Sequence, residues 1–289
     1  MVTRMKLSSK IIAGFIAIVL ITAVVGAVSW SGLTRVMTKA NVVFESNTAK
    51  NLQNDCAKYR RDFVIYGFTP LPGRDKTAEQ LWNEGYTQMT DTLKHIAVLE
   101  SANADSVARV SASLKASEEY KGDFGDVTKA RKMKEEGLSV WGTVGAKVTE
   151  SIGIARQTLD PLMANAESAG DWAAYSRWAK VSTTLERDVI ADFVLLRVYA
   201  NQYAKALGDS EYNRYKEQLT KLGKNLSSWH GLVNDNETLR GIGESMVKDI
   251  DEYTKGGETF HQAVLDENTA NTEAIASAGA VVKSIDEFC

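Results

Sequence analysis

The sequence predicts an all-α chain of six helices forming two stacked four-helix bundles, preceded by a transmembrane helix. Apolar residues recur at helical spacing along nearly the whole chain. Only 3 of the 289 residues are proline. The few clusters of helix-breaking residues are short. The apolar stretch 11–28 has about the length of a spanning helix and runs into this pattern without a break.

The N-terminal segment predicts both membrane attachment and orientation. Residues 1–10 are basic, and no acidic residue precedes Glu45, so the positive-inside rule keeps this end in the cytoplasm. We therefore expect residues 11–30 to cross the inner membrane and residues 31–289 to lie in the periplasm. A cleavable signal peptide is the alternative, because residues 27–29 are small, although signal h-regions are usually shorter.

Composition and motifs exclude several function classes. The net charge of -3 does not suggest a nucleic-acid partner, and no basic patch stands out in the sequence. No fingerprint of a nucleotide-binding loop, hydrolase or metalloprotease is present, so we expect neither enzyme activity nor a cofactor. We expect Cys56 to pack as a small hydrophobe. No metal or haem spacing links the cysteines and histidines, which are Cys56, Cys289, His95, His230 and His261.

Breakers divide the first half into three helices. The first is expected over residues 8–68, because the prolines within residues 69–73 each remove a backbone donor. The second is expected over 75–100 and ends at a weak turn signal, residues 101–103. The third continues to about residue 166, with a kink expected near its proline.

Three more helices follow. The fourth is expected over residues 171–207, and the fifth begins with Asp209 or Ser210 as its N-cap and ends near Val233. Residues 234–236 should turn the chain and cap a sixth helix that runs to the end. The glycine pair 256–257 suggests a soft spot within it.

Helix lengths suggest the bundle topology. The first two helices together match the third in length, and the fourth and fifth together nearly match the sixth, so we expect each pair to stack end to end. The sixth helix stops about 8 residues short of the membrane, which suggests a truncated receptor with a second span. The expected membrane-proximal bundle comprises residues 31–68, 130–207 and 262–289, and the distal bundle residues 74–129 and 209–261.

The residues before the first break resemble a known sensor family. Residues 57–67 combine arginine, an acidic residue, an aromatic, aliphatics and a glycine, and residues 196–200 echo them loosely. Tyr253 and Phe260 are seven residues apart in the sixth helix. Together with the architecture, these features resemble the helical bimodular sensor domain of bacterial methyl-accepting chemotaxis receptors, over about residues 8–289.

The resemblance implies a ligand-gated homodimeric sensor of a small organic acid or amino acid. Known members recognise dicarboxylates or acetate, and arginines converge on the ligand in the dicarboxylate binders. Here Arg60 matches one arginine position, whereas Ala57, Phe193 and Asn271 stand at others. Cytoplasmic signalling partners are expected only if the protein continues beyond Cys289.

A count of helical rise places four residues at one height, beside the junction of the bundles: Arg60, Arg197, Asn271 and Thr272. Arg60 and Arg197 would together bind one carboxylate group of a ligand. Asp192 and Glu267 would repel a second carboxylate, so we expect a monocarboxylate or a zwitterionic ligand. Ordinary salt bridges to Asp62 or Asp192 are the alternative explanation of these arginines. The candidate ligand-binding residues are Arg60, Arg61, Asp192, Arg197, Asn271 and Thr272.

Aromatic side chains on every helix of the expected distal bundle are more typical of a core than of a second pocket, for which His95 or His230 would supply polar contacts. The sequence thus predicts the extracytoplasmic sensor region of a chemoreceptor. The sensor half of a histidine kinase or nucleotide cyclase is one alternative, and a non-sensing anchored scaffold is another.

Overall fold

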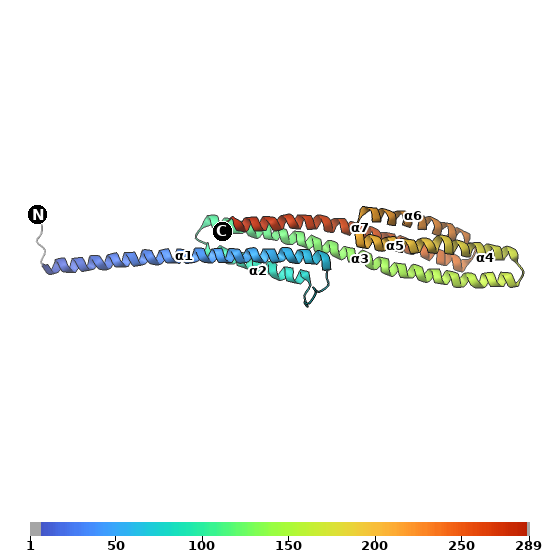
Figure 1. Ribbon diagram of the computed structural model, residues 1–289, viewed down its shortest axis with the longest axis horizontal. Helices are drawn as coiled ribbons and strands as arrows, with labels where there is room; N and C mark the ends of the chain where they lie inside the picture. Colours follow the sequence, from blue (N-terminus) through green and yellow to red (C-terminus); the bar gives the residue numbers. More distant parts are fainter. Residues whose placement is uncertain (1–6, 288–289) are drawn as a thin grey trace. The chain divides into compact units, whose positions relative to one another are not determined.

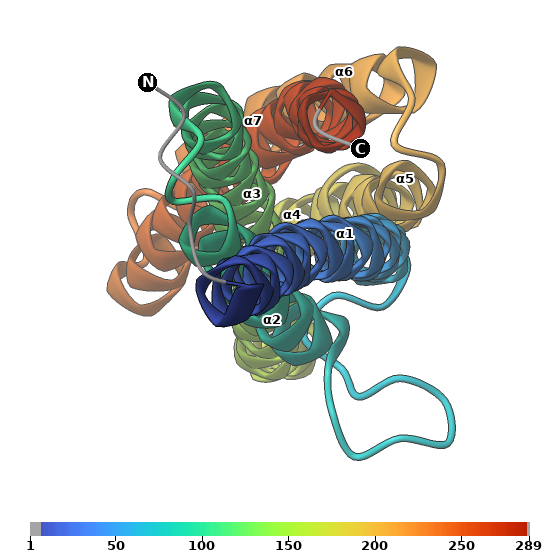
Figure 2. The same cartoon turned by 90° about the vertical axis from the view of Figure 1, so that its left-hand side faces the viewer.

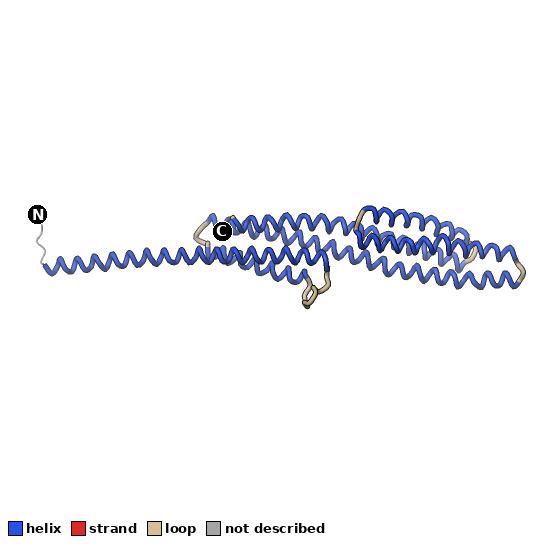
Figure 3. Tube along the Cα trace, viewed as in Figure 1, coloured by secondary structure: helices blue, strands red, loops and turns tan. Residues whose placement is uncertain are grey.

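The computed structural model describes residues 7–287, which are helical apart from short connections (Figure 3). Within these residues no β-strand forms, and the only β-type pairing is an isolated bridge between Pro70 and Thr77. The all-α prediction is therefore confirmed. The elements are α1 (Leu7–Tyr66), α2 (Ala78–Leu99), α3 (Ala104–Ser168), α4 (Trp172–Thr184), the π-helix η1 (Leu185–Ile190), α5 (Ala191–Ala206), α6 (Asp209–Leu232) and α7 (Glu237–Asp286).

The first break lies where the prolines predicted it. Helix α1 ends at Tyr66, and Gly67 follows it with a positive φ of 58°, a conformation that glycine adopts without strain. Helix α2 begins after Thr77 with a capping box, in which the Thr77 hydroxyl accepts from the Gln80 N–H and the Gln80 side chain accepts from the Thr77 N–H.

The other boundaries agree with the sequence in most details. Pro161 lies inside α3, which continues to Ser168. Asn236 caps α7 as expected, since its Oδ1 accepts from the Leu239 N–H at 3.0 Å. The N-cap of α6 is Gly208, so the prediction of Asp209 or Ser210 is wrong by one or two residues.

The chain forms two compact units, and each contains four helical segments when α4, η1 and α5, which follow one another without a gap, are counted as one. The first unit comprises Met1–Phe124 and Glu273–Cys289, and the second comprises Gly125–Thr272. Helices α1 and α2 belong to the first unit, whereas η1 and the helices α4, α5 and α6 belong to the second. Helices α3 and α7 contribute residues to both. Two four-helix units were expected, but their membership differs from the expected one.

The prediction that residues 31–68 and 74–129 lie in different bundles is wrong. Helix α2 folds back beside α1 and runs antiparallel to it (Figures 1 and 2). The Cys56 thiol donates to the Trp82 carbonyl at 3.7 Å, and further back along α1 Glu45 contacts His95 at 3.3 Å.

The reversal of α2 has a physical cause that helix length does not reveal. The loop between α1 and α2 contains two glycines with positive φ, Gly67 and Gly73, which allow the chain to turn. The apolar stripe of α2, formed by Trp82, Met89 and Ile96 at seven-residue spacing, is then fully buried in the first unit.

The second half repeats this reversal, so the assignment of residues 130–207 and 209–261 to separate bundles is also wrong. Helix α6 folds back and packs on α4 and α5. One contact between them is a hydrogen bond in which the Trp229 indole donates to the Val181 carbonyl at 3.2 Å. At the other end of α6 the ring of Tyr212 lies 5.2 Å from that of Tyr203.

In the second unit, glycines bring α3 and α7 into close contact. A Cβ atom added at Gly137 would lie 2.8 Å from the Phe260 Cβ and 2.9 Å from the Gly256 carbonyl oxygen. A Cβ at Gly256 would lie 2.6 Å from a Val140 methyl group. The glycine pair 256–257 is therefore a tight packing point within an unbroken α7, and the prediction of a soft spot is wrong.

Among the described residues, α1 is the one helix that is long and apolar enough to cross a membrane, and its apolar part lies near the N-terminus. The side chains of this apolar part are exposed to the surroundings of the protein, as expected for a lipid-facing segment; Phe15, for example, is 69% exposed. The basic residues Arg4 and Lys6 and the terminal Cys289 lie outside the described residues.

Replacing Gly137 by alanine should destabilise the second unit by about 1 to 3 kcal/mol, because the new methyl group would overlap the α7 backbone. Gly142 is a matched control on the same helix, since a Cβ there meets nothing within 4 Å, and Gly142→Ala should stabilise by about 0.5 to 1 kcal/mol. Urea unfolding followed by circular dichroism measures both. Equal midpoints for the two variants would contradict the close approach.

Candidate functional site

A groove of about 330 Å³ in the first unit contains two of the predicted ligand residues. Helix α1 lines it with polar side chains that recur at helical spacing, and α7 lines it with small and aliphatic ones. The lining residues are Gln53, Asn54, Ala57, Arg60 and Arg61 from α1 and Ile275, Ala278, Gly279 and Val282 from α7. Such a groove combines a cationic wall with a narrow apolar one.

Arg60 is held in a defined position. Arg60 is only 5% exposed, and its guanidinium group forms a hydrogen bond with the hydroxyl of Tyr120 on α3. That hydroxyl also accepts from the Trp82 indole at 3.2 Å. Desolvation of the buried phenol is the main cause that raises the pKa of Tyr120, while these hydrogen bonds lower it. A buried guanidinium with a fixed orientation is well suited to bind a carboxylate.

The amide neighbours of Arg60 complete the groove. Gln53 is 1% exposed, and its Nε2 donates to the Ala278 carbonyl at 3.3 Å, which ties α1 to α7 at one end. Asn54 and Arg61 are exposed along the open side. Arg60 and Arg61 are thus the two predicted ligand residues that the structure places in one cavity.

Asp192 lies in the second unit and already has partners on α6. Its carboxylate accepts from Lys221 Nζ at 2.8 Å and from Asn225 Nδ2 at 2.6 Å, and its carbonyl accepts from Gln218 at 3.0 Å. The residue is 4% exposed, so these bonds offset the cost of burying its charge. Asp192 therefore joins α5 to α6, and its selection as a ligand residue has no support in this geometry.

The structure does not bring Arg60 and Arg197 into one site, because Arg60 belongs to the first unit and Arg197 to the second. Arg60 contacts Tyr120 of α3, whereas Arg197 lies within van der Waals distance of a Cβ built at Gly145 of the same helix. About seven turns of α3 separate these two positions. The predicted clamping of one carboxylate by both arginines therefore has no support in this geometry.

The remaining predicted contacts belong to the second unit as well. Thr272 is exposed, and its hydroxyl donates back to the Asn268 carbonyl at 2.9 Å, while Asn271 is half-buried. Glu267 is 5% exposed and forms ion pairs with Lys134 and, at 3.5 Å, with Arg131. Neither Glu267 nor Asp192 lines the groove, so the argument against a dicarboxylate does not apply to it.

The aromatic residues expected in one distal bundle divide between the two units and form their cores. Trp82 stacks on Phe124 in the first unit, with ring centroids 4.2 Å apart. Trp229 is fully buried in the second. The core interpretation is confirmed for these residues. Of the histidines proposed as polar contacts, His95 pairs with Glu45 and His230 packs under Gly243.

His261 is a polar contact that the sequence reasoning did not single out. Its Nδ1 lies 2.6 Å from the Tyr203 hydroxyl, and its ring stacks on Tyr212 with centroids 3.5 Å apart. Burial lowers the pKa of His261. The charge of Lys216 lowers this pKa further, whereas the charge of Asp209 raises it. Only the return of α6 onto α7 assembles this cluster, so no local pattern in the sequence indicates it.

Comparison with known proteins gives no family assignment, because no protein-family model matches the chain and no curated protein matches it. Among the described residues, no group of three or more His, Cys, Asp or Glu side chains is arranged to hold a metal ion. The groove at Arg60 is therefore interpreted from its own geometry.

The His261 cluster predicts a loss of stability in mild acid. Because the folded-state pKa of His261 lies below its ordinary value, the unfolded chain binds a proton more readily as pH falls. The free energy of unfolding should therefore fall as pH is lowered through about 6.5, the ordinary pKa of histidine. Unfolding titrations between pH 8 and pH 5 should show a shallower slope for His261→Gln, and an unchanged slope would contradict the assignment.

Proposed function

We propose that the chain is the extracytoplasmic sensor region of a transmembrane chemoreceptor, and that the groove at Arg60 binds a small organic acid. The observation that carries this proposal is the placement of that groove on α1. Helix α1 is unbroken from Leu7 to Tyr66, so the helix that supplies Arg60 is also the helix with the candidate span. A ligand in the groove would bridge α1 and α7.

The chemistry of the groove favours a carboxylate ligand. Arg60 offers a desolvated guanidinium and Arg61 an exposed one, and the amides of Gln53 and Asn54 add neutral hydrogen-bonding groups. Small residues of α7, Ala278 among them, leave room for the ligand beside these donors. A bound acid would alter the packing of α1 against α7, and a stiff helix would transmit that displacement towards the membrane.

The same ectodomain would serve a different output equally well. A histidine kinase or nucleotide cyclase would use the same groove, and its catalytic domain would follow the sensor. A non-sensing scaffold would instead bind no small molecule. Ligand binding therefore separates a sensor from a scaffold, but it does not distinguish one type of output from another.

Arg60→Ala should weaken binding of the ligand by about 2 to 5 kcal/mol, because it removes a desolvated charge partner. Arg61→Ala should cost about 1 kcal/mol or less, since its side chain is exposed to solvent. Thermal-shift screening with monocarboxylates, dicarboxylates and amino acids identifies the ligand, and isothermal titration then measures each variant.

Arg197→Ala is the matched control, because it removes an arginine of the second unit and should leave affinity unchanged. Arg60→Lys, which keeps the charge, guards against loss of folding in Arg60→Ala. If Arg60→Ala and the unaltered protein bind the acid equally well, the groove is not its site. A loss of binding in Arg197→Ala alone would place the site in the second unit.

We also propose that the sensor forms a homodimer through α1. Leu33, Met37, Ala40 and Phe44 of α1 follow the three- and four-residue steps of a heptad seam, and all four are exposed in the single chain. Phe44 is 70% exposed, although it lies well beyond the apolar stretch 11–28 that is the candidate span. A second copy of the same helix would bury this stripe symmetrically.

Phe44→Asp should therefore shift the full chain from dimer to monomer in detergent. Ile154→Asp is the control, since Ile154 is an exposed apolar residue of the second unit, 45% exposed, and is not part of the seam. Sedimentation velocity over a range of protein concentrations measures both. A monomer at every concentration, with and without ligand, would refute the homodimer.

A further inference from the structure

The turn between α2 and α3 lies beside the part of α1 that directly follows the candidate span. A cavity of about 640 Å³ separates them, within the size range of ligand sites. Helix α1 contributes aromatic and cationic side chains to it, and the turn contributes one carboxylate and one amide. Its lining includes Trp30, Arg35 and Lys39 from α1, Leu99 from the end of α2, and Glu100 and Asn103 from the turn.

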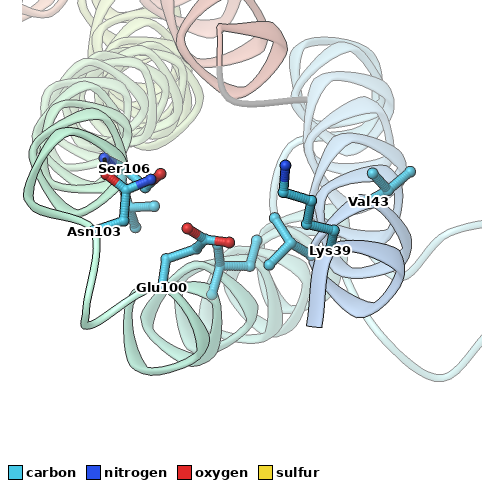
Figure 4. A pocket seen from close by; sticks show the side chains of 8 residues that line it. Lys39, Val43, Glu100, Asn103 and Ser106 are labelled. Atoms are coloured by element: carbon cyan, nitrogen blue, oxygen red, sulfur yellow. Dashed lines mark hydrogen bonds between the residues drawn. The ribbon is translucent and has the colours of Figure 1, made fainter. Parts of the chain in front are cut away.

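A second, inner cavity of about 250 Å³ adjoins the first, because Lys39, Glu100 and Asn103 line both. Figure 4 shows these three side chains around one opening, Lys39 from α1 and the others from the end of α2 and the start of α3. Buried aliphatic residues, Ile96 and Val110 among them, close the inner cavity. The site is thus polar at its mouth and apolar behind it.

The end of the outer cavity that Trp30 and Arg35 line lies at the level of the polar surface of a bilayer. A span of about 20 residues that begins at Ile11 ends near Trp30, a residue type enriched at membrane interfaces. The helical rise places Arg35 roughly 8 Å and Lys39 roughly 14 Å beyond that level. The headgroup layer on each side is roughly 5 to 8 Å thick, and a lysine side chain can reach back towards it.

The charges at the mouth are of both signs. Arg35 and Lys39 are suited to a phosphate group, whereas the half-buried carboxylate of Glu100 is suited to a cationic group. A purely anionic headgroup would therefore meet the Glu100 carboxylate unfavourably. A quaternary ammonium has no N–H to donate, but a primary ammonium can hydrogen-bond that carboxylate.

We propose that this cavity binds the headgroup of an aminophospholipid of the ethanolamine type. Arg35 and Lys39 hold the phosphate, Glu100 holds the ammonium group, and the acyl chains lie along the exposed apolar residues of α1 such as Val24 and Val28. The bound lipid fixes the α2–α3 turn to the membrane surface. This inference rests on α1 as a membrane span and is independent of acid binding at Arg60.

The test uses the full chain in nanodiscs of phosphatidylcholine alone, or with phosphatidylethanolamine or phosphatidylglycerol added. Native mass spectrometry after extraction into mild detergent counts the lipids retained per protein. Retention of phosphatidylethanolamine should exceed that of phosphatidylcholine by roughly tenfold, the effect of one charge-assisted hydrogen bond. Equal retention of the three lipids would overturn the proposal.

Variants identify the groups involved. Lys39→Gln should lower retention of both phosphatidylethanolamine and phosphatidylglycerol, whereas Glu100→Gln should lower retention of phosphatidylethanolamine alone. Lys94→Gln is the matched control, because Lys94 is exposed on α2 and pairs with Asp91. Lys39→Arg should retain the lipid and shows that loss in Lys39→Gln is not misfolding. Retention unaffected by both glutamine variants would exclude this cavity.

Free phosphoethanolamine distinguishes the two sources of the headgroup. Added to the lipid-loaded protein in detergent, it should not displace phosphatidylethanolamine at equimolar concentration, because it lacks the acyl chains that contact α1. Displacement under those conditions would show a site for a soluble phosphoamine and would overturn the membrane assignment. Titration of the acid ligand in the same nanodiscs reports on the Arg60 groove separately.

Discussion

The close approach of α3 and α7 in the second unit is the constraint on which much of the structure depends. Gly137 and Gly256 allow the two backbones to meet, and a methyl group at either position would overlap its neighbour. The same approach seats the Tyr215 ring against Gly257 and sets Lys134 opposite the buried Glu267. Further along the same helix, α7 supplies Ala278 and Gly279 to the groove beside Arg60.

Buried charges have different roles in the two units. In the second unit Glu267 and Asp192 each meet cationic side chains on a neighbouring helix, so their function is to hold helices together. In the first unit Arg60 is fixed by a hydrogen bond with the neutral Tyr120 hydroxyl, and its side chain borders a cavity. Because the buried Arg60 side chain borders the groove, it is the residue that the proposed acid ligand would meet.

Helix α1 links three features on which the proposed sensor function rests. Its N-terminal part is apolar and exposed, its next turns border the cavity at Lys39 and Glu100, and Arg60 lies near its end. Because one continuous helix carries all three, a change at the groove and a contact at the membrane surface act on the same rigid element. The proposed lipid contact would give that element a fixed reference at the bilayer.

The sequence by itself determined the helices, the candidate span and the break at Pro70 and Pro72, and it singled out Arg60 and Arg61, which line one groove. Periodicity, proline and capping residues are local signals, so they specify where a helix begins and ends. Only the tertiary structure decided that α2 and α6 reverse, that Arg60 and Arg197 belong to different units, and that Lys221 of α6 pairs with Asp192. The direction of a chain after a turn depends on which apolar stripe is buried against which, and that choice is made by contacts between residues far apart in sequence.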